Sequence, residues 1–145
     1  MSLEQKLEQS EQLLETNERN KLEEQNARRA AQQAQNQVRV STARVQQAQN
    51  QLQQAVAAKN AAQQRASDDD NRSSSTASYD AEISRAREAL SAANRELQAA
   101  HREQIRAEGI LEHAEEVHRA SAEKLSGVVD DLQAVAQKYN LEMGK

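Results

Sequence analysis

The sequence predicts an all-α protein, a single long antiparallel two-helix coiled-coil hairpin in which residues 1–145 form one domain. Aromatic residues make up 1% of the chain, and Phe, Trp, Pro and Cys are absent. Such a chain cannot build a thick globular core, where aromatic side chains supply much of the buried area. Leucine and alanine instead recur at seven-residue spacing in both halves of the chain, as in coiled coils. One short segment rich in Asp and Ser separates the two halves.

The first helix is predicted over residues 2–66. Its seam alternates larger residues at one core position with small residues at the other, which is the pattern of a closely packed coiled coil. The larger set is Val38, Val45, Leu52, Lys59 and Ala66, and the small set is Ala34, Ser41, Ala48, Ala55 and Ala62. At the start of the helix, Ser2 and Gln5 have the spacing of a capping box.

Residues 67–78 are predicted to be the connecting loop. Three consecutive Asp residues, 68 to 70, repel one another, and the Ser and Thr side chains compete for backbone hydrogen bonds, so a helix is disfavoured there. Ser78, followed by Asp80 and Glu82, supplies a cap and acidic residues for the start of the second helix.

The second helix is predicted over residues 79–143, and its heptad pattern is the longest in the chain. The larger seam positions are Ile83, Leu90, Leu97, Gln104, Leu111, His118, Leu125, Leu132 and Tyr139. The smaller seam positions are Ala86, Ala93, Ala100, Ala107, Ala114, Ser121, Val128 and Val135.

An antiparallel register can be chosen in which every large residue faces a small one. In this register Val45 faces Ala100 and Leu52 faces Ala93, which fills the interface without voids. The same register predicts four ion pairs: Arg44–Glu103, Arg65–Glu82, Glu23–Lys124 and Arg28–Glu115. It also places Lys59 opposite Ala86, with its ammonium group near Glu88.

The apolar face widens in the terminal third of the hairpin, beyond what two helices can bury. A further helix, from a protein partner or a second copy, would cover it, so pairing into a larger bundle stays open. The predicted partner-binding residues are Leu3, Leu7, Leu14, Val129, Leu132, Ala136, Tyr139 and Met143. A smaller apolar flank, Ile110 and Val117, lies on the other side. An alternative site is the loop, with Asp68, Asp69, Asp70 and Arg72.

The sequence indicates neither an enzyme nor a cofactor or metal site. Glu115 and His118 have the Glu-x-x-His spacing of di-iron bundles, but there is one copy, Arg28 opposes a cation, and His118 falls on the seam opposite Ala27. The three Gly residues are scattered, so there is no phosphate loop. Nucleic-acid binding is not expected, because residues 25–66 are basic but lack aromatic residues, and the net charge is −4.

No apolar run approaches the length of a membrane span. The N-terminal residues lack the basic and apolar regions of a cleavable signal peptide, so we expect a cytoplasmic protein or one exported by a non-Sec route.

In shape and composition the chain resembles the receptor-binding hairpins of bacterial colicins and S-type pyocins, and the stalk proteins of type III export ATPases. It also resembles the small partner proteins of type VII secretion substrates, although their Trp-x-Gly turn and C-terminal signal are missing. A bias of 13 Arg to 6 Lys favours a bacterial source. The resulting hypotheses are an interaction module for secretion or assembly, or a rigid spacer or receptor-binding stalk that presents the 67–78 loop. A stress-protective helical protein is disfavoured by the regular seam.

Overall fold

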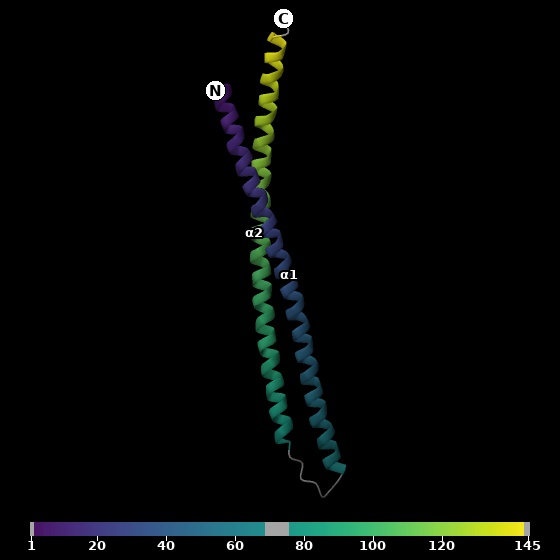
Figure 1. The fold of residues 1–145 in the computed structure, drawn as a ribbon. Coiled ribbons are helices and arrows are strands. Elements are labelled where there is room, and N and C mark those ends of the chain that lie inside the picture. Colours follow the sequence, from purple (N-terminus) through teal and green to yellow (C-terminus); the bar gives the residue numbers. More distant parts are fainter. Residues whose placement is uncertain (1, 69–75, 144–145) are drawn as a thin grey trace. The chain divides into compact units, whose positions relative to one another are not determined.

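The structure, a computed structural model, describes residues 2–68 and 76–143, and side chains over 2–65 and 76–140. Two helices make up this part of the chain: α1 (Leu3–Asp68) and α2 (Ala77–Met143) (Figure 1). They pack against each other, so the predicted all-α two-helix hairpin is confirmed. Each helix extends two residues further toward the loop than the predicted bounds of 66 and 79.

The start of α1 is capped as predicted. The Ser2 backbone N–H donates to Gln5 Oε1 at 3.1 Å, and the Gln5 N–H donates to Ser2 Oγ at 3.2 Å. The start of α2 differs, because Ser78 lies inside the first turn and Thr76 precedes the helix. The Asp80 N–H donates to the Thr76 carbonyl at 2.8 Å, and the Thr76 hydroxyl lies 3.4 Å from Asp80 Oδ2. Thr76 therefore occupies the N-cap position, two residues earlier than expected.

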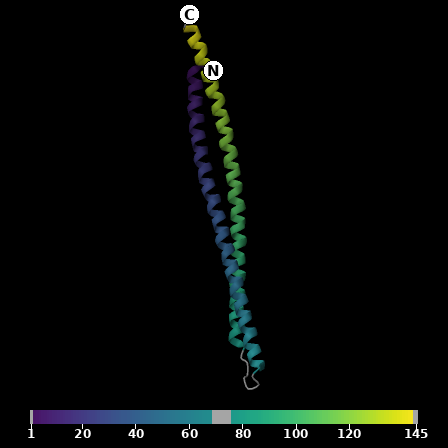
Figure 2. The same ribbon diagram turned by 90° about the vertical axis from the view of Figure 1, so that its right-hand side faces the viewer.

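The chain divides into two compact units, each built from a segment of both helices. The terminal unit contains residues 1–32 and 106–145, and the tip unit contains residues 33–105. Within each unit, a segment of α1 runs antiparallel beside a segment of α2 (Figures 1 and 2). The terminal unit holds most of the predicted partner-binding residues, and the tip unit flanks the predicted loop.

The buried residues follow the predicted seam. All of them are small except Val45 and Ile83 in the tip unit and Asn20 in the terminal unit. The buried apolar set is Ala27, Ala31, Ala34, Val45, Ala48, Ile83, Ala86, Ala93, Ala100 and Ala107. Alanine at these positions lets two backbones approach closely, while the larger seam residues Leu90 and Leu97 pack beside them half-buried. The heptad assignment is therefore confirmed for the seam positions whose side chains are described, except Tyr139, which is exposed.

The predicted register is wrong by one heptad in the tip unit. Val45 shares a buried cluster with Ala93, not the predicted Ala100. The Arg44 guanidinium lies 3.2 Å from the carboxylate of Glu96, one heptad before the predicted Glu103. Lys59 Nζ lies 2.6 Å from Asp80 Oδ1 and not beside Glu88, although its stem is half-buried along the seam as expected.

The terminal unit has the same offset. Ser121 Oγ donates to Asn17 Oδ1 at 2.9 Å, whereas the predicted register places Asn17 opposite Val128, one heptad later. Both side chains are short, so this bond fixes the local alignment of the backbones. The predicted pair Arg28–Glu115 does form, at 3.9 Å, because long side chains reach across a turn. Within the described residues, Glu23 and Lys124 form no ion pair.

The offset has a physical cause. A seam that alternates large and small residues every seven positions looks the same after a shift of one heptad, so apolar packing cannot distinguish the two registers. The polar seam residues can. In the observed register Asn17 meets Ser121, whereas in the predicted one Asn17 would face Val128 and lose its hydrogen bond.

Candidate partner-binding surface

The first helix of the terminal unit carries three exposed leucines on one face. Leu3, Leu7 and Leu14 are spaced by four and seven residues, which brings side chains to the same side of a helix. Their exposed fractions are 55%, 47% and 50%. A leucine at a seam position, Leu13, is by comparison half-buried. These three leucines are therefore apolar area that α2 leaves uncovered.

The second helix adds two residues to the same face. Leu14 follows the half-buried seam residue Leu13 by one position. In the same way, Val129 follows the half-buried seam residue Val128. Both are thus rotated from the seam by about 100° in the same sense. On antiparallel helices, equal rotations bring side chains to the same side of the pair. Val129 is 40% exposed, and Ala136, one heptad later, is exposed too.

We define the apolar stripe as Leu3, Leu7, Leu14, Val129 and Ala136. Of the other predicted residues, Leu132 is half-buried in the seam. Tyr139 continues the seam but is 60% exposed. The register explains this exposure, because the last turns of α2 extend beyond the first turn of α1 (Figures 1 and 2). The side chain of Met143 lies outside the described residues.

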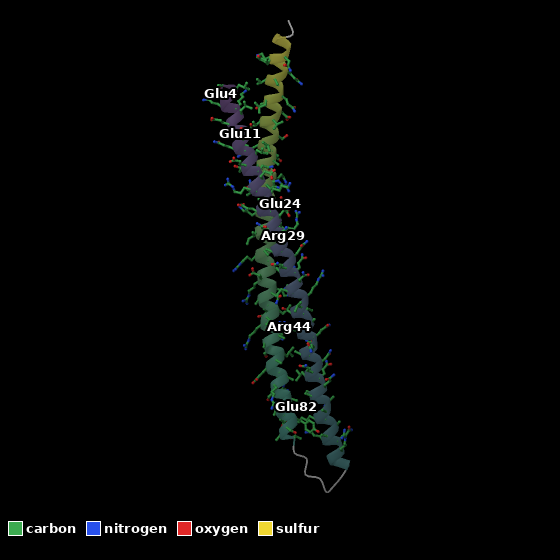
Figure 3. The ribbon with its side chains drawn as sticks, in the orientation of Figure 1. Glu4, Glu11, Glu24, Arg29, Arg44 and Glu82 are labelled. Atoms are coloured by element: carbon green, nitrogen blue, oxygen red, sulfur yellow. The ribbon has the colours of Figure 1, made fainter. Side chains whose placement is uncertain are left out.

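Charged and polar side chains end the stripe toward the tip unit. Arg28 Nη2 lies 3.1 Å from Glu24 Oε1 and 3.9 Å from Glu115 Oε1, so it bridges carboxylates of both helices. Glu24, labelled in Figure 3, also bonds His118 Nδ1 across the helix pair. The prediction that His118 faces Ala27 is therefore wrong, since a carboxylate meets the imidazole. The side chains of Glu24 and His118 are 16% and 27% exposed, so their contact is partly shielded from water.

Asn17, Asn20 and Glu24 are polar seam residues of α1 that the sequence prediction left out. Asn20 is buried, and Asn17 and Glu24 are half-buried. The sequence does contain a pattern that places them in the seam. They are spaced by three and four residues from one another, on the face that continues Ala27 and Ala31. Because they are polar, a heptad pattern of apolar residues does not include them.

The predicted second flank, Ile110 and Val117, lines a shallow groove with His113 and Ala114 of α2 and with Glu23, Asn26 and Ala27 of α1. Ile110 is 56% exposed and Val117 is half-buried. Two polar residues of α1, Glu23 and Asn26, border the groove.

The alternative loop site cannot be described from the structure. Asp69, Asp70 and Arg72 lie outside the described residues, and Asp68 is placed only as the last residue of α1.

Neither helix, over residues 3–68 and 77–143, is long and apolar enough to cross a membrane. Within the described part of the chain, no group of three or more His, Asp or Glu is arranged to hold a metal ion.

Comparison with protein families, curated proteins and solved structures finds no match to this chain.

Proposed function

We propose that the chain is a non-catalytic interaction module that docks a helix of a protein partner or of a second copy on the apolar stripe of the terminal unit. The observation that carries the proposal is the exposure of Leu3, Leu7 and Leu14 on one helix face. A helix laid along this face would bury them in the manner of helix-in-groove recognition. Scattered exposed apolar residues are ordinary, but a row at helical spacing on a two-helix unit is not.

The expected affinity is modest. Fully burying a leucine side chain contributes about 1.5–3 kcal/mol, so covering a half-exposed one contributes roughly 1 kcal/mol. Three leucines with Val129 would then supply a few kcal/mol, against the entropy lost when two molecules associate. These contacts alone therefore supply reversible binding no tighter than about the millimolar range, and tighter binding requires further contacts from the partner.

The test uses a synthetic amphipathic peptide with Leu at its two core heptad positions and Gln at the flanking ones. Binding to the full chain is followed by titration calorimetry, and the mass of the free chain by light scattering. Leu7→Glu with Val129→Glu should abolish peptide binding and any self-association, while circular dichroism retains most of the helix signal, because both residues lie off the seam.

The matched control places the same substitutions on the tip unit. Val40 and Ile105 are exposed apolar residues, at 46% and 71%, and lie outside the stripe. Val40→Glu with Ile105→Glu should leave binding unchanged. Equal loss in both double variants would mean that added charge, not the stripe, controls association.

Deleting residues 69 to 76 separates this proposal from the spacer alternative. Binding through the stripe should survive the deletion. If the deletion abolishes association and the Leu7→Glu, Val129→Glu variant retains it, the loop is the binding element and the stalk function replaces the one proposed.

A further inference from the structure

An acidic row runs along the outer edge of the apolar stripe. It consists of Glu4, Glu11 and Glu18, spaced by seven residues and therefore on one face of α1. Glu11 follows Leu7 by four residues and precedes Leu14 by three, so its side chain neighbours both leucines on the helix surface. Figure 3 labels Glu4 and Glu11 on this first part of α1.

No described cation of the terminal unit pairs with the acidic row. All three glutamates are exposed, and none of them forms an ion pair or hydrogen bond with another described residue. By contrast, Glu24, two turns further along α1, bonds Arg28 and His118. The glutamates beside the stripe are thus available to a molecule that covers the leucines. Glu24, which lies beyond the end of the stripe, is already bonded within the chain.

The opposite border of the stripe, on α2, is uncharged. Ser126 and Gln133 lie three residues before and four residues after Val129, and both are exposed. A helix that lies on the stripe therefore meets negative charge along one edge and neutral side chains along the other. In helix–helix pairing, such flanking charges select the partner and its orientation.

We infer that the occupant of the apolar stripe is an amphipathic helix of another protein, with leucine-like residues at heptad spacing and Lys or Arg every seventh residue along one edge. This inference rests on the proposed function and names the chemistry of its partner. The basic edge would lie over Glu4, Glu11 and Glu18. A second copy fits less well, because it brings the same glutamates and the neutral Ser126 and Gln133, and so supplies no row of cations.

The span of the exposed leucines sets the length of the contact. Leu3 to Leu14 spans about 16 Å along α1 at the rise of an α-helix, or three turns. The partner segment therefore needs at least two heptads, and a peptide of three heptads is a sufficient probe.

The experiment compares three peptides of three heptads with the same Leu core. Their flanking row is Lys in the first, Gln in the second and Glu in the third. With the full wild-type chain, the Lys peptide should bind about tenfold or more tightly than the Glu peptide at low salt, and the ratio should shrink as salt is added. Glu4→Lys, Glu11→Lys and Glu18→Lys together should reverse the preference.

A second triple variant controls for net charge. Glu8, Glu15 and Glu23 are exposed on α1 but lie away from the stripe, so Glu8→Lys, Glu15→Lys and Glu23→Lys change the charge equally. This variant should keep the preference for the Lys peptide. If it reverses the preference as strongly as the first variant, the effect is long-range charge and the inference fails.

The remaining outcomes also decide between the two proposals. Equal binding of all three peptides, still lost in the Leu7→Glu, Val129→Glu variant, would overturn the basic partner and leave the docking function intact. Self-association through the stripe, with no binding of any peptide, would make a second copy the occupant and overturn the inference. Absence of both peptide binding and self-association would overturn both.

Discussion

At the scale of single residues, the seam contains one polar group that the fold leaves unsatisfied. Ser41 is 1% exposed, and its hydroxyl has no hydrogen-bond partner among the described residues. A hydroxyl buried in this way loses its bonds to water and gains none from the protein, which costs about 1–3 kcal/mol. Sequence reasoning placed Ser41 correctly among the small seam residues, but it could not tell whether the hydroxyl would find a partner.

We therefore expect Ser41→Ala to raise the free energy of unfolding by about 1 kcal/mol, since it removes the unpaired hydroxyl and improves helix propensity. The measurement is chemical denaturation followed by circular dichroism. Ser91→Ala is the matched control, because Ser91 is exposed on α2 and reports propensity alone. An equal gain in the two variants would show that burial of the Ser41 hydroxyl carries no cost.

A second residue-scale prediction concerns the ion pair between Lys59 and Asp80, 2.6 Å apart. The hydrogen bond from Lys59 holds the pKa of Asp80 below its ordinary value of 3.8. Because the folded-state pKa is lowered, the pair stabilises the fold above the ordinary pKa, and this contribution is lost as pH falls through the lowered value.

Asp80→Asn should therefore reduce stability at neutral pH and have a smaller effect at pH 2, because protonation of the carboxyl removes the contribution of the ion pair. Denaturation curves of both chains between pH 2 and pH 6 test this. Glu88→Gln serves as the control, since Glu88 was the partner predicted for Lys59 and the structure pairs that ammonium with Asp80. A pH-independent difference between Asp80→Asn and the wild type would contradict the prediction.

At the scale of helices, the heptad pattern predicted both α1 and α2 to within two residues at each described end. The pattern succeeds because alanine at one seam position is buried wherever the helices pair, as at Ala48 and Ala93.

Two glycines interrupt α2, and the backbone conformation requires glycine at neither position. A Cβ atom added at Gly109 or Gly127 would meet nothing within 4 Å, and neither residue has a positive φ.

Gly109→Ala and Gly127→Ala should each stabilise the chain, by about 0.5–1 kcal/mol, because glycine loses more backbone entropy when it enters a helix. The reverse substitution at an exposed position of the same helix, Ala120→Gly, should lose a similar amount. Thermal and urea unfolding of the three variants check the signs. A loss of stability in Gly127→Ala would indicate that a close contact forms there in solution.

At the scale of the whole molecule, the sequence could establish which residues are in the seam but not which partner each one meets. Apolar packing is unchanged by a shift of one heptad, and exposed ion pairs contribute only about 0–1 kcal/mol each. The candidate site was located by the same reasoning, since Leu7 and Val129 fall outside the seam and both are exposed. Its occupant could not be deduced from the pattern, because a broad apolar face fits any helix.

The register itself can be tested by cross-linking. Val45→Cys with Ala93→Cys should oxidise readily to an intramolecular disulfide, since the two residues share one buried cluster. Val45→Cys with Ala100→Cys represents the register shifted by one heptad and should oxidise slowly. Fast closure of the second pair and slow closure of the first would restore the register predicted from apolar residues alone.

A polar bond across the seam can select the register where apolar packing cannot. If the bond between Asn17 and Ser121 does so, then Asn17→Leu with Ser121→Ala should make the shifted register competitive. Each helix runs without a break through both units, so a shift in the terminal unit carries the tip unit with it. The doubly substituted chain should therefore close the 45–100 disulfide at a rate approaching that of the 45–93 disulfide, while its unfolding free energy stays equal or rises. Buried polar pairs are often replaceable by apolar residues without loss of stability, and their removal costs specificity instead. If the 45–100 pair still closes slowly in that chain, the register is held by other contacts, of which the bond between Glu24 and His118 is the next to remove.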